Sequence, residues 1–542
     1  MQPLNLNPIQ PQLAESSLGI LDGAGPTSAS ANEFNPLFTR NRFSLQMNGV
    51  AAKQDSDLEP NRDHNTRSTD LVHAGVWGRY SYSIGTFHDY NAGIRPNHDR
   101  DREIDNAFVQ MALDHHTSVQ FEYRNMQTEE GDLPLRYDPT LFSTNKRTLI
   151  ESRIRRLGLR HNLAPGNTVL FSAIRQQRTE DNSDNKILDF PAPIGSIPFS
   201  SNAESDESGH TFELQHQLNR SGYRLISGIG TSRSDLKTTI NANFATSLCP
   251  PYCPFQYAPP TTDIRHHNGY LYTHLDQSTQ LSWTLGISID DIEIEFKDDT
   301  QFNPKLGLIW QLNDSTMLRA AAFRSLKRRL TSNQTLEPTH IAGFNQFYDD
   351  INGTESRRYG IALEKRGEIV HGGVELSRRD LKTLFPAIEP EWQERLHRAY
   401  IYWAPLNWLA ASAEYQYESF TRPPEHSANQ HDATVGFPEL RTHQLPFGIT
   451  LFSSSGFTTK ITATHVDQEG LFFLENGSLE KHAEDFWTVD TSLSYRLNRR
   501  VGRITIGAKN LFDNDFRYHN VDFATNHIMP ERMIFTHLSL SF

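Results

Sequence analysis

Hydrophobic and polar residues alternate in three segments between Asp485 and the end of the chain. In the last segment Ile534, Leu538, Leu540 and Phe542 fall on one side, and polar residues fall on the other. A period of two predicts β-strands with one apolar and one polar face. The polar faces carry too many charges for the core of a β-sandwich, so we expect a wet interior with lipid on the outside.

The same alternation recurs from about Phe38 onward, as pairs of strands joined by short turns and separated by longer polar stretches. The turns are built from Gly, Pro, Asn, Asp and Ser, which favour tight reversal of the chain. Roughly nine hairpins, up to three opening strands and one terminal strand give about 22 strands, an even total as single-chain closure of a bacterial barrel requires. The expected turns lie near residues 77–78, 115–117, 163–167, 219–222, 276–279, 313–315, 366–368, 405–407, 453–456 and 498–500.

This pattern predicts an all-β fold, a transmembrane antiparallel β-barrel over residues 36–542. Polar stretches of roughly 15 to 35 residues between the hairpins suit long extracellular loops, and the short turns suit the periplasmic side. Residues 1–35 are expected to be an irregular leader, because Pro3, Pro8, Pro11 and Pro26 prevent regular strand pairing.

The composition is consistent with a membrane barrel although only 37% of residues are hydrophobic. Only every second residue of such a strand faces lipid, and the chain has no apolar run of the ~18 residues that a membrane helix needs. Aromatic residues make up 11% of the chain, which fits girdles at the two membrane interfaces. A net charge of −13 argues against nucleic acid as a partner.

Three sets of residues resemble the TonB-dependent receptor family. Asn510, Leu511 and Phe512, followed by a long loop and a terminal strand that ends at Phe542, resemble the carboxyl end of such a barrel. The runs Asn303 to Leu308 and Leu336 to Pro338 resemble the mid-barrel pattern of the same family. The resemblance implies that the ridge of Ile534, Leu538, Leu540 and Phe542 closes the barrel and is read by the outer-membrane assembly machinery.

The resemblance also implies a place in the bacterial outer membrane, contact with its lipid and lipopolysaccharide, and uptake of a scarce ligand. The start of the sequence departs from the family pattern, with no export signal, no TonB box and no plug domain ahead of the barrel. We therefore expect a processed chain, a misplaced start or a fragment, with a plug or periplasmic domain encoded upstream. Energised transport would require such a segment or a separately encoded partner.

Two alternatives remain open. One is a passive or export channel attached to an upstream periplasmic domain of helical repeats, and the other is a surface barrel that transports nothing. Catalysis has no support, because the chain has no Gly-x-Ser-x-Gly, no His-Glu-x-x-His and no phosphate-binding glycine loop. We expect no enzyme activity and no cofactor.

One loop combines basic and aromatic residues in the way that family members use to contact anionic ligands. Its candidate contacts by resemblance are Arg328, Arg329, Phe344, Phe347, Tyr348 and Arg357. The alternative is that the basic residues hold anionic lipopolysaccharide or simply face the lumen.

Cys249 and Cys253 are close together in another loop, and an oxidising compartment favours a disulfide between them over two free thiols. Two cysteines alone cannot complete a tetrahedral metal site. Histidines at 115–116, 266–267, 519 and 527 are read as solvated loop residues, so no specific metal is expected.

Overall fold

The structure is a computed structural model. It describes residues 41–542 apart from 57–58, 60–63, 191–194, 245–254, 259–260, 295–296, 329–333, 349, 351, 383–390, 423–437, 475–477, 520–527 and 529. The expected leader at residues 1–35 lies outside the described residues, and so do Cys249, Cys253 and Arg329.

The described residues form one antiparallel sheet of 23 strands. The short β10 (Phe255–Tyr257) pairs with β9 beyond the end of β11, so 22 strands make up the ring. The ring strands are β1 (Arg42–Gln54), β2 (His64–Trp77), β3 (Tyr80–Asn91), β4 (Arg100–Ala112), β5 (Thr117–Glu130), β6 (Arg147–Ala164), β7 (Asn167–Phe190), β8 (Gly195–Arg220), β9 (Tyr223–Phe244), β11 (Thr262–Asp276), β12 (Leu281–Ile294), β13 (Lys297–Asn313), β14 (Thr316–Leu326), β17 (Glu355–Arg366), β18 (Val370–Lys382), β19 (Glu391–Leu406), β20 (Leu409–Thr421), β21 (Glu439–Phe452), β22 (Phe457–Phe473), β23 (Leu479–Arg496), β24 (Gly502–Lys509) and β25 (Met533–Ser541).

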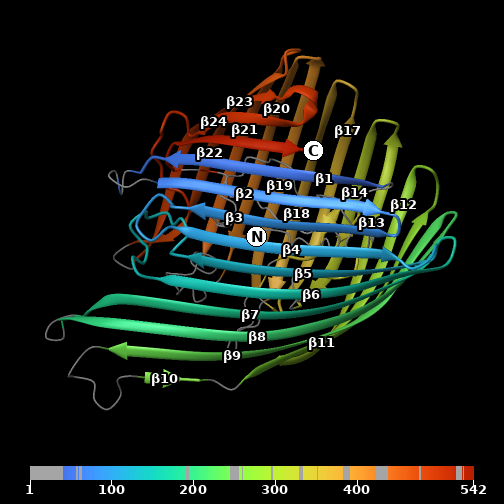
Figure 1. Ribbon diagram of the computed structural model, residues 1–542, viewed down its shortest axis with the longest axis horizontal. Helices are drawn as coiled ribbons and strands as arrows, with labels where there is room; N and C mark the ends of the chain where they lie inside the picture. Colours follow the sequence, from blue (N-terminus) through green and yellow to red (C-terminus); the bar gives the residue numbers. More distant parts are fainter. Residues whose placement is uncertain are drawn as a thin grey trace.

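The last strand closes the ring against the first. β25 pairs with β1 along its length, with Leu538 opposite Gly49 and Ile534 opposite Lys53. Leu45 and Phe542 add two backbone hydrogen bonds of 3.0 and 2.9 Å between their amides and carbonyls. The predicted closed barrel of about 22 strands is therefore confirmed, with the blue and red strands side by side in Figure 1.

The outer surface is apolar and the interior is polar. Outward positions carry large exposed hydrophobic side chains, such as Ile229 at 63% and Ile506 at 55% exposure, whereas Thr505 between such positions is buried inside. A continuous apolar surface of this kind is stable only in lipid. Trp77 and Trp408 are exposed beside the short turns, where interfacial aromatics belong. No helix among the described residues is long and apolar enough to cross a membrane.

Short turns lie within about two residues of each place where the sequence predicts them, because Gly, Asn and Pro mark them locally. The strands are longer than predicted on the opposite side. The polar stretch between Gln176 and Thr211 was expected to be a loop, yet β7 has 24 residues, β8 has 26, and both project past their neighbours (Figure 1). Beyond the membrane both faces of a strand meet water, so no alternation of apolar residues marks it.

Candidate functional site

The segment between β14 and β17, which the resemblance made a candidate ligand-contact loop, folds into the barrel. We call its described residues, 327–328, 334–348, 350 and 352–354, the lumenal insert. Leu336, Ile341 and Phe344 are 1%, 0% and 1% exposed, as in a protein core. The predicted contact loop is therefore part of the barrel interior.

The tip of the lumenal insert is a small hairpin of β15 (His340–Ile341) and β16 (Phe344–Asn345). Ala342 and Gly343 between them have φ values of 47° and 87°, the conformation that a type I′ turn requires. Arg319, close to the short β13–β14 turn, donates a hydrogen bond of 3.1 Å to the Ala342 carbonyl. The tip thus reaches the periplasmic end of the barrel.

The barrel wall has a glycine where the tip packs. A Cβ added to Gly360 on β17 would lie 2.3 Å from a ring carbon of Phe344. A side chain at this position would collide with the insert, so Gly360 permits the close approach.

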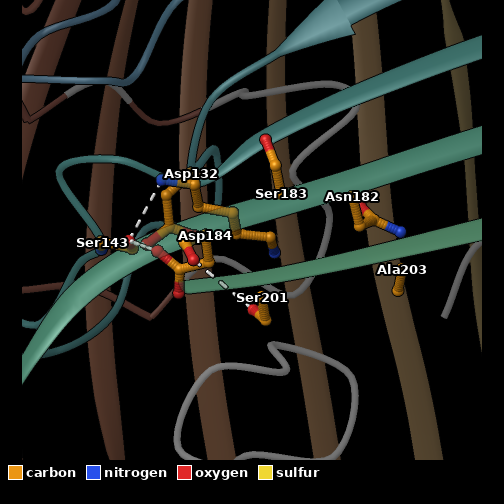
Figure 2. Close-up of a pocket in the computed structure, with 8 residues that line it drawn as sticks. Asp132, Ser143, Asn182, Ser183, Asp184, Ser201 and Ala203 are labelled. Atoms are coloured by element: carbon orange, nitrogen blue, oxygen red, sulfur yellow. Dashed lines mark hydrogen bonds between the residues drawn. The ribbon is translucent and has the colours of Figure 1, made fainter. Parts of the chain in front are cut away.

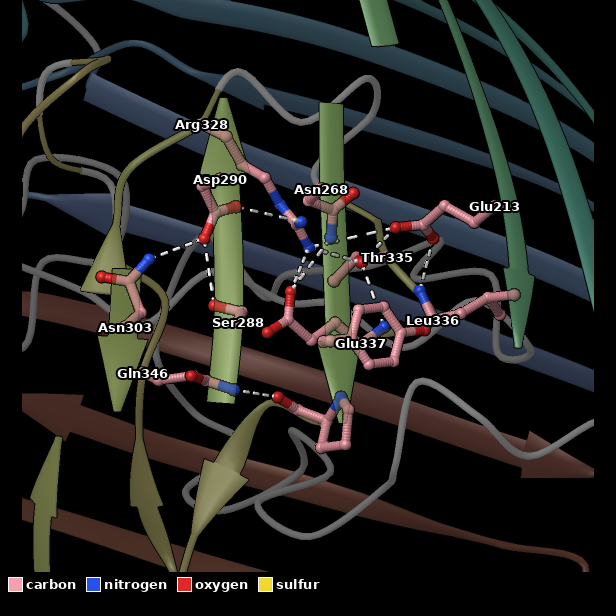
Figure 3. A network of polar contacts seen from close by, with 12 residues as sticks. Glu213, Asn268, Ser288, Asp290, Asn303, Arg328, Thr335, Leu336, Glu337 and Gln346 are labelled. Carbon is pink, nitrogen blue, oxygen red and sulfur yellow. Dashed lines mark hydrogen bonds and ion pairs between the residues drawn. The ribbon is translucent and has the colours of Figure 1, made fainter. Parts of the chain in front are cut away.

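Buried charges hold the middle of the insert against the barrel wall (Figure 3). Arg328 forms an ion pair of 3.0 Å with Glu337 and donates a hydrogen bond of 2.8 Å to Thr335. Glu213 on β8 accepts hydrogen bonds of 2.5 Å from the Thr335 hydroxyl and the Leu336 amide. The Arg328, Glu337 and Glu213 side chains are at most 3% exposed, so each charge depends on the others for compensation.

Strands β11 to β13 extend this network. The Tyr272 hydroxyl donates a hydrogen bond of 2.5 Å to Glu337, and Lys305 donates one of 2.6 Å to Gln346. Asp290 accepts hydrogen bonds from Asn303 at 2.7 Å and from Ser288 at 3.0 Å. Side chains from four wall strands, β8 and β11 to β13, therefore fix one segment.

Two further contacts extend the insert across the lumen. Arg156 on β6 donates a hydrogen bond of 2.9 Å to Gln334 and pairs with Glu122 at 2.6 Å. On the other side, Arg379 on β18 pairs with Asp350 of the insert and, at 2.5 Å, with Glu394 on β19. The insert therefore contacts wall strands from β6 to β18. The Arg379–Glu394 pair connects its last contact to the neighbouring strand β19.

The aromatic residues predicted as ligand contacts face cations inside the barrel, and their contact with a ligand stays a prediction. The guanidinium carbon of Arg328 lies 5.3 Å from the ring centre of Phe347, and that of Arg379 lies 3.8 Å from Tyr348. Phe344 is flanked by Arg319 at 5.3 Å. These contacts stabilise the inward fold of the segment.

Arg357 points the other way. It is exposed on the outer face of β17, with exposed Tyr359 and Ile361 next on the same face. Arg328 and Arg357 therefore belong to two environments, the lumen and the membrane surface, and do not form one site.

A second closure lies at the other end of the barrel. We call residues 92–99 and 131–146, which connect β3 to β4 and β5 to β6, the mouth loops. Tyr137 stacks on Phe472 of β22 with ring centres 4.4 Å apart, and it packs with Phe420 and Leu440. These partners lie at the ends of β20 to β22 away from the short turns, so the mouth loops cross the extracellular opening.

Hydrogen bonds to carbonyl groups hold the two mouth loops together. Arg95 donates to the carbonyls of Asp132 and Pro134, both at 2.8 Å. His98 contacts the Leu133 carbonyl through Nε2 at 2.8 Å and accepts from the Ile94 amide through Nδ1 at 3.2 Å. Burial, reinforced by the nearby Arg95 charge, lowers the pKa of His98 to about 3, so the ring is neutral near pH 7.

A pocket of about 180 Å³ lies where a mouth loop meets the β7–β8 hairpin (Figure 2). Ser143 donates a hydrogen bond of 2.8 Å to Asp184, and its amide donates one of 2.9 Å to Asp132. Lys146 also lines the pocket. This volume is below the ~300 Å³ at which ligand pockets usually begin.

The remaining predicted residues are placed as follows. Asn510 is buried at the end of β24, where its side chain donates to the Asn514 carbonyl at 3.0 Å, while Leu511 and Phe512 are exposed. Ile534, Leu538 and Phe542 are exposed on the outer face of the closing strand. Their role as an assembly signal stays a prediction.

The two histidines at 266 and 267 do not form one cluster. His266 is buried beside Asp290, with 3.0 Å between Nε2 and the carboxylate, and His267 is exposed on the other face of β11. Neighbours on a strand point to opposite faces, so the pair cannot chelate one ion.

The sequence interpretation missed the wall residues Arg156, Glu213, Asp290 and Arg379. Each occupies an inward position of a strand, where charge is expected in any water-filled barrel. The one local signal is Leu336 to Pro338, and from the sequence it indicates only a family pattern.

Comparison with known proteins agrees with this architecture. The family model described as "TonB dependent receptor-like, beta-barrel" matches residues 18–354, more than half of the chain. No curated protein matches the sequence. Several solved structures share the fold at low identity.

The unliganded ferric citrate transporter FecA has 12% identity and a TM-score of 0.67, with 92% of this chain and 78% of that chain covered. The copper transporter OprC has 11% identity and a TM-score of 0.68, with 93% and 81% covered. The ferripyoverdine receptor of the Pseudomonas aeruginosa outer membrane has 13% identity and a TM-score of 0.64, with 94% and 72% covered. The chain belongs to the TonB-dependent receptor β-barrel family of the bacterial outer membrane.

Proposed function

We propose that this barrel takes up a scarce ligand across the outer membrane, and that the lumenal insert must move before the ligand passes. The observation that carries the proposal is the insert itself, which crosses the interior and is held by buried ion pairs. A segment fixed by charges that compensate one another suits a gate that is closed at rest. The width of a 22-strand ring supports this, because such a lumen would be an aqueous channel unless it were filled.

The ligand class is part of the proposal. The structural neighbours are a ferric citrate transporter, a copper transporter and a ferripyoverdine receptor, which supports a metal chelate as the first ligand to test. Binding of ferric citrate to the purified barrel in detergent can be followed by quenching of tryptophan fluorescence.

A passive or export channel is the second candidate, and the same wide ring favours it. Conductance in planar lipid bilayers separates the two functions. We expect little steady current through the wild-type barrel, and an open channel when residues 334–348 are replaced by a short Gly-Ser linker. A variant that also lacks residues 133–142 removes any block by the mouth loops.

Steady current through the wild-type barrel, equal to that of the excised variants, would contradict the gate and favour the passive channel. Absence of current in all variants, despite normal heat-modifiability on gels, would favour a surface barrel without transport.

A further inference from the structure

One row of the outer surface concentrates arginine side chains. Strand pairing places Arg155 of β6 directly opposite Arg175 of β7, with Tyr123 of β5 on its other side. Arg153 lies two residues further along β6 on the same face, and all three arginines are exposed. These residues come from neighbouring strands, so the barrel fold gathers them into one patch.

The next row toward the short turns is apolar. Phe121, Leu157, Ala173 and Phe212 are successive cross-strand partners, and Phe121, Leu157 and Phe212 are 48%, 49% and 45% exposed. β6 ends at Ala164, beside the short turn. Arg155 therefore lies roughly 30 Å from that turn along the strand, or ~23 Å from it along the membrane normal for a strand tilt of ~40°. The apolar band of such barrels is ~25 Å tall. The arginines therefore lie at the outer edge of the lipid belt.

The three arginines have no compensating partner among the described residues. Like charges directly opposite each other on neighbouring strands are destabilising. The nearest carboxylate on this face of β6 is that of Glu151, one step further from the membrane, and it forms no ion pair with them. His210 is the cross-strand partner of Arg175 on β8 and supplies no negative charge.

The same row contains a second pair of opposed arginines, for which the protein itself supplies the negative charge. Beyond His210 the row continues to Arg233 of β9 and Arg265 of β11, again directly opposite each other. Arg233 pairs with Asp235 at 3.2 Å and with Asp263 at 3.1 Å, and Arg265 pairs with Asp263 at 2.6 Å. The Arg233–Arg265 pair is internally neutralised, and the Arg155–Arg175 pair is not.

We propose that Arg153, Arg155 and Arg175 bind the phosphate groups of an outer-leaflet lipid, with acyl chains lying on Phe121, Leu157 and Phe212. Guanidinium groups match phosphate oxygens in bidentate geometry, and two opposed arginines can bracket one phosphate. A lipid fits better than a free phosphate ion because the basic row is continuous with the apolar belt. The site does not depend on transport, so it can be tested separately from the gate.

Native mass spectrometry of the full chain in detergent can test the site with lipid A, which carries phosphates on an acylated disaccharide, and with dephosphorylated lipid A. We expect R153Q/R155Q/R175Q to weaken lipid A binding by roughly a hundredfold, since each basic side chain at an anionic membrane surface contributes about fivefold. The control R233Q/R265Q removes arginines that already have carboxylate partners, and its affinity should stay within about twofold of wild type. Dephosphorylated lipid A should bind weakly to every form.

Equal loss in the triple variant and the control would mean general electrostatics and would overturn the site. So would unchanged binding in the triple variant. If inorganic phosphate alone protects the wild-type barrel against heat as well as lipid A does, the site takes a free anion and the lipid assignment is wrong. Heat-modifiability on gels should be the same for all forms, because every substituted side chain points outward.

Discussion

The lumenal insert and the mouth loops both obstruct the same barrel, but different interactions hold them. Buried charges hold the insert, with Arg328 and Arg379 as the central cations. At the mouth, backbone carbonyls, a neutral histidine and a stacked tyrosine join the two loops to each other and to the wall, and the buried ion pair of Arg136 with Asp132 is local to one loop. Cooperative charge networks fail when one member is lost, whereas stacking and carbonyl contacts fail piece by piece. The insert should therefore open in one cooperative step, whereas the mouth loops should loosen gradually.

The largest effect should follow from the loss of Arg328. Arg328→Met leaves Glu213 buried without its cation and Glu337 with only the more distant Lys305, and breaking a buried ion pair typically costs about 3–5 kcal/mol. We expect residues 334–346 to detach from the wall and to lose protection in hydrogen–deuterium exchange.

Arg357→Met is the matched control for this prediction, because Arg357 borders the same segment but lies outside the barrel. The combined variant R328M/E213Q/E337Q should regain protection, since it removes the uncompensated charges. If R328M exchanges like wild type, the charge network does not hold the insert.

Loss of the tyrosine at the mouth should have the next largest effect. Tyr137→Ala removes a buried ring from Phe472, Phe420 and Leu440, and truncation of a buried aromatic costs about 3 kcal/mol or more. We expect faster exchange in residues 131–146 and unchanged exchange in the insert. Loss of protection in both regions would show that the mouth loops and the insert are coupled, and it would contradict the view that separate interactions hold them. Tyr137→Phe, which keeps the ring, serves as the control.

A steric change should displace the insert without altering any charge. Gly360→Ala places a methyl group against the Phe344 ring, and overpacking of this kind costs about 1–3 kcal/mol. We expect a modest rise in bilayer conductance. Gly269→Ala, at an outer position with open space around its Cβ, should leave conductance unchanged. Equal conductance for the two variants would argue against a tight fit of the tip.

Acid should loosen the mouth loops. Burial depresses the pKa of His98 to about 3, so the closed form excludes a proton that the open form takes up below about pH 6.5. Closure is therefore fully favoured above pH 6.5 and weakens by about 1.4 kcal/mol per pH unit down to about pH 3. Burial raises the pKa of Asp132, but the charge and hydrogen bonds of Arg136, the Ser143 amide and the Arg95 charge together lower it below 3.8, so the stability that Asp132 contributes is lost only as the pH falls below about 3.8.

The pH effect can be measured by hydrogen–deuterium exchange of residues 131–146 at pH 7 and 5.5, corrected for the intrinsic exchange rate. His98→Gln should remove the difference between the two pH values. A pH dependence that survives in this variant would assign the effect to another group.

The local pattern of the sequence was enough to predict the ring. Alternation at Ile504 and Ile506 identifies a strand face that meets lipid, and Asn, Gly and Pro identify the turns, since both signals depend on neighbours within a few residues. The terminal segment ending at Phe542 predicted closure for the same reason. The polar ends of β7 and β8 have no such signal, because water covers both of their faces.

The sequence by itself determined the barrel, its membrane face and the position of its short turns. Only the tertiary structure decided that residues 334–348 turn inward, because their partners Arg156 and Glu213 lie more than 120 positions earlier in the chain. An aromatic and basic segment between two strands suits an exposed loop equally well until the wall supplies compensating charges. Burial of charge is decided by groups brought together in space, and a single sequence does not display that pairing.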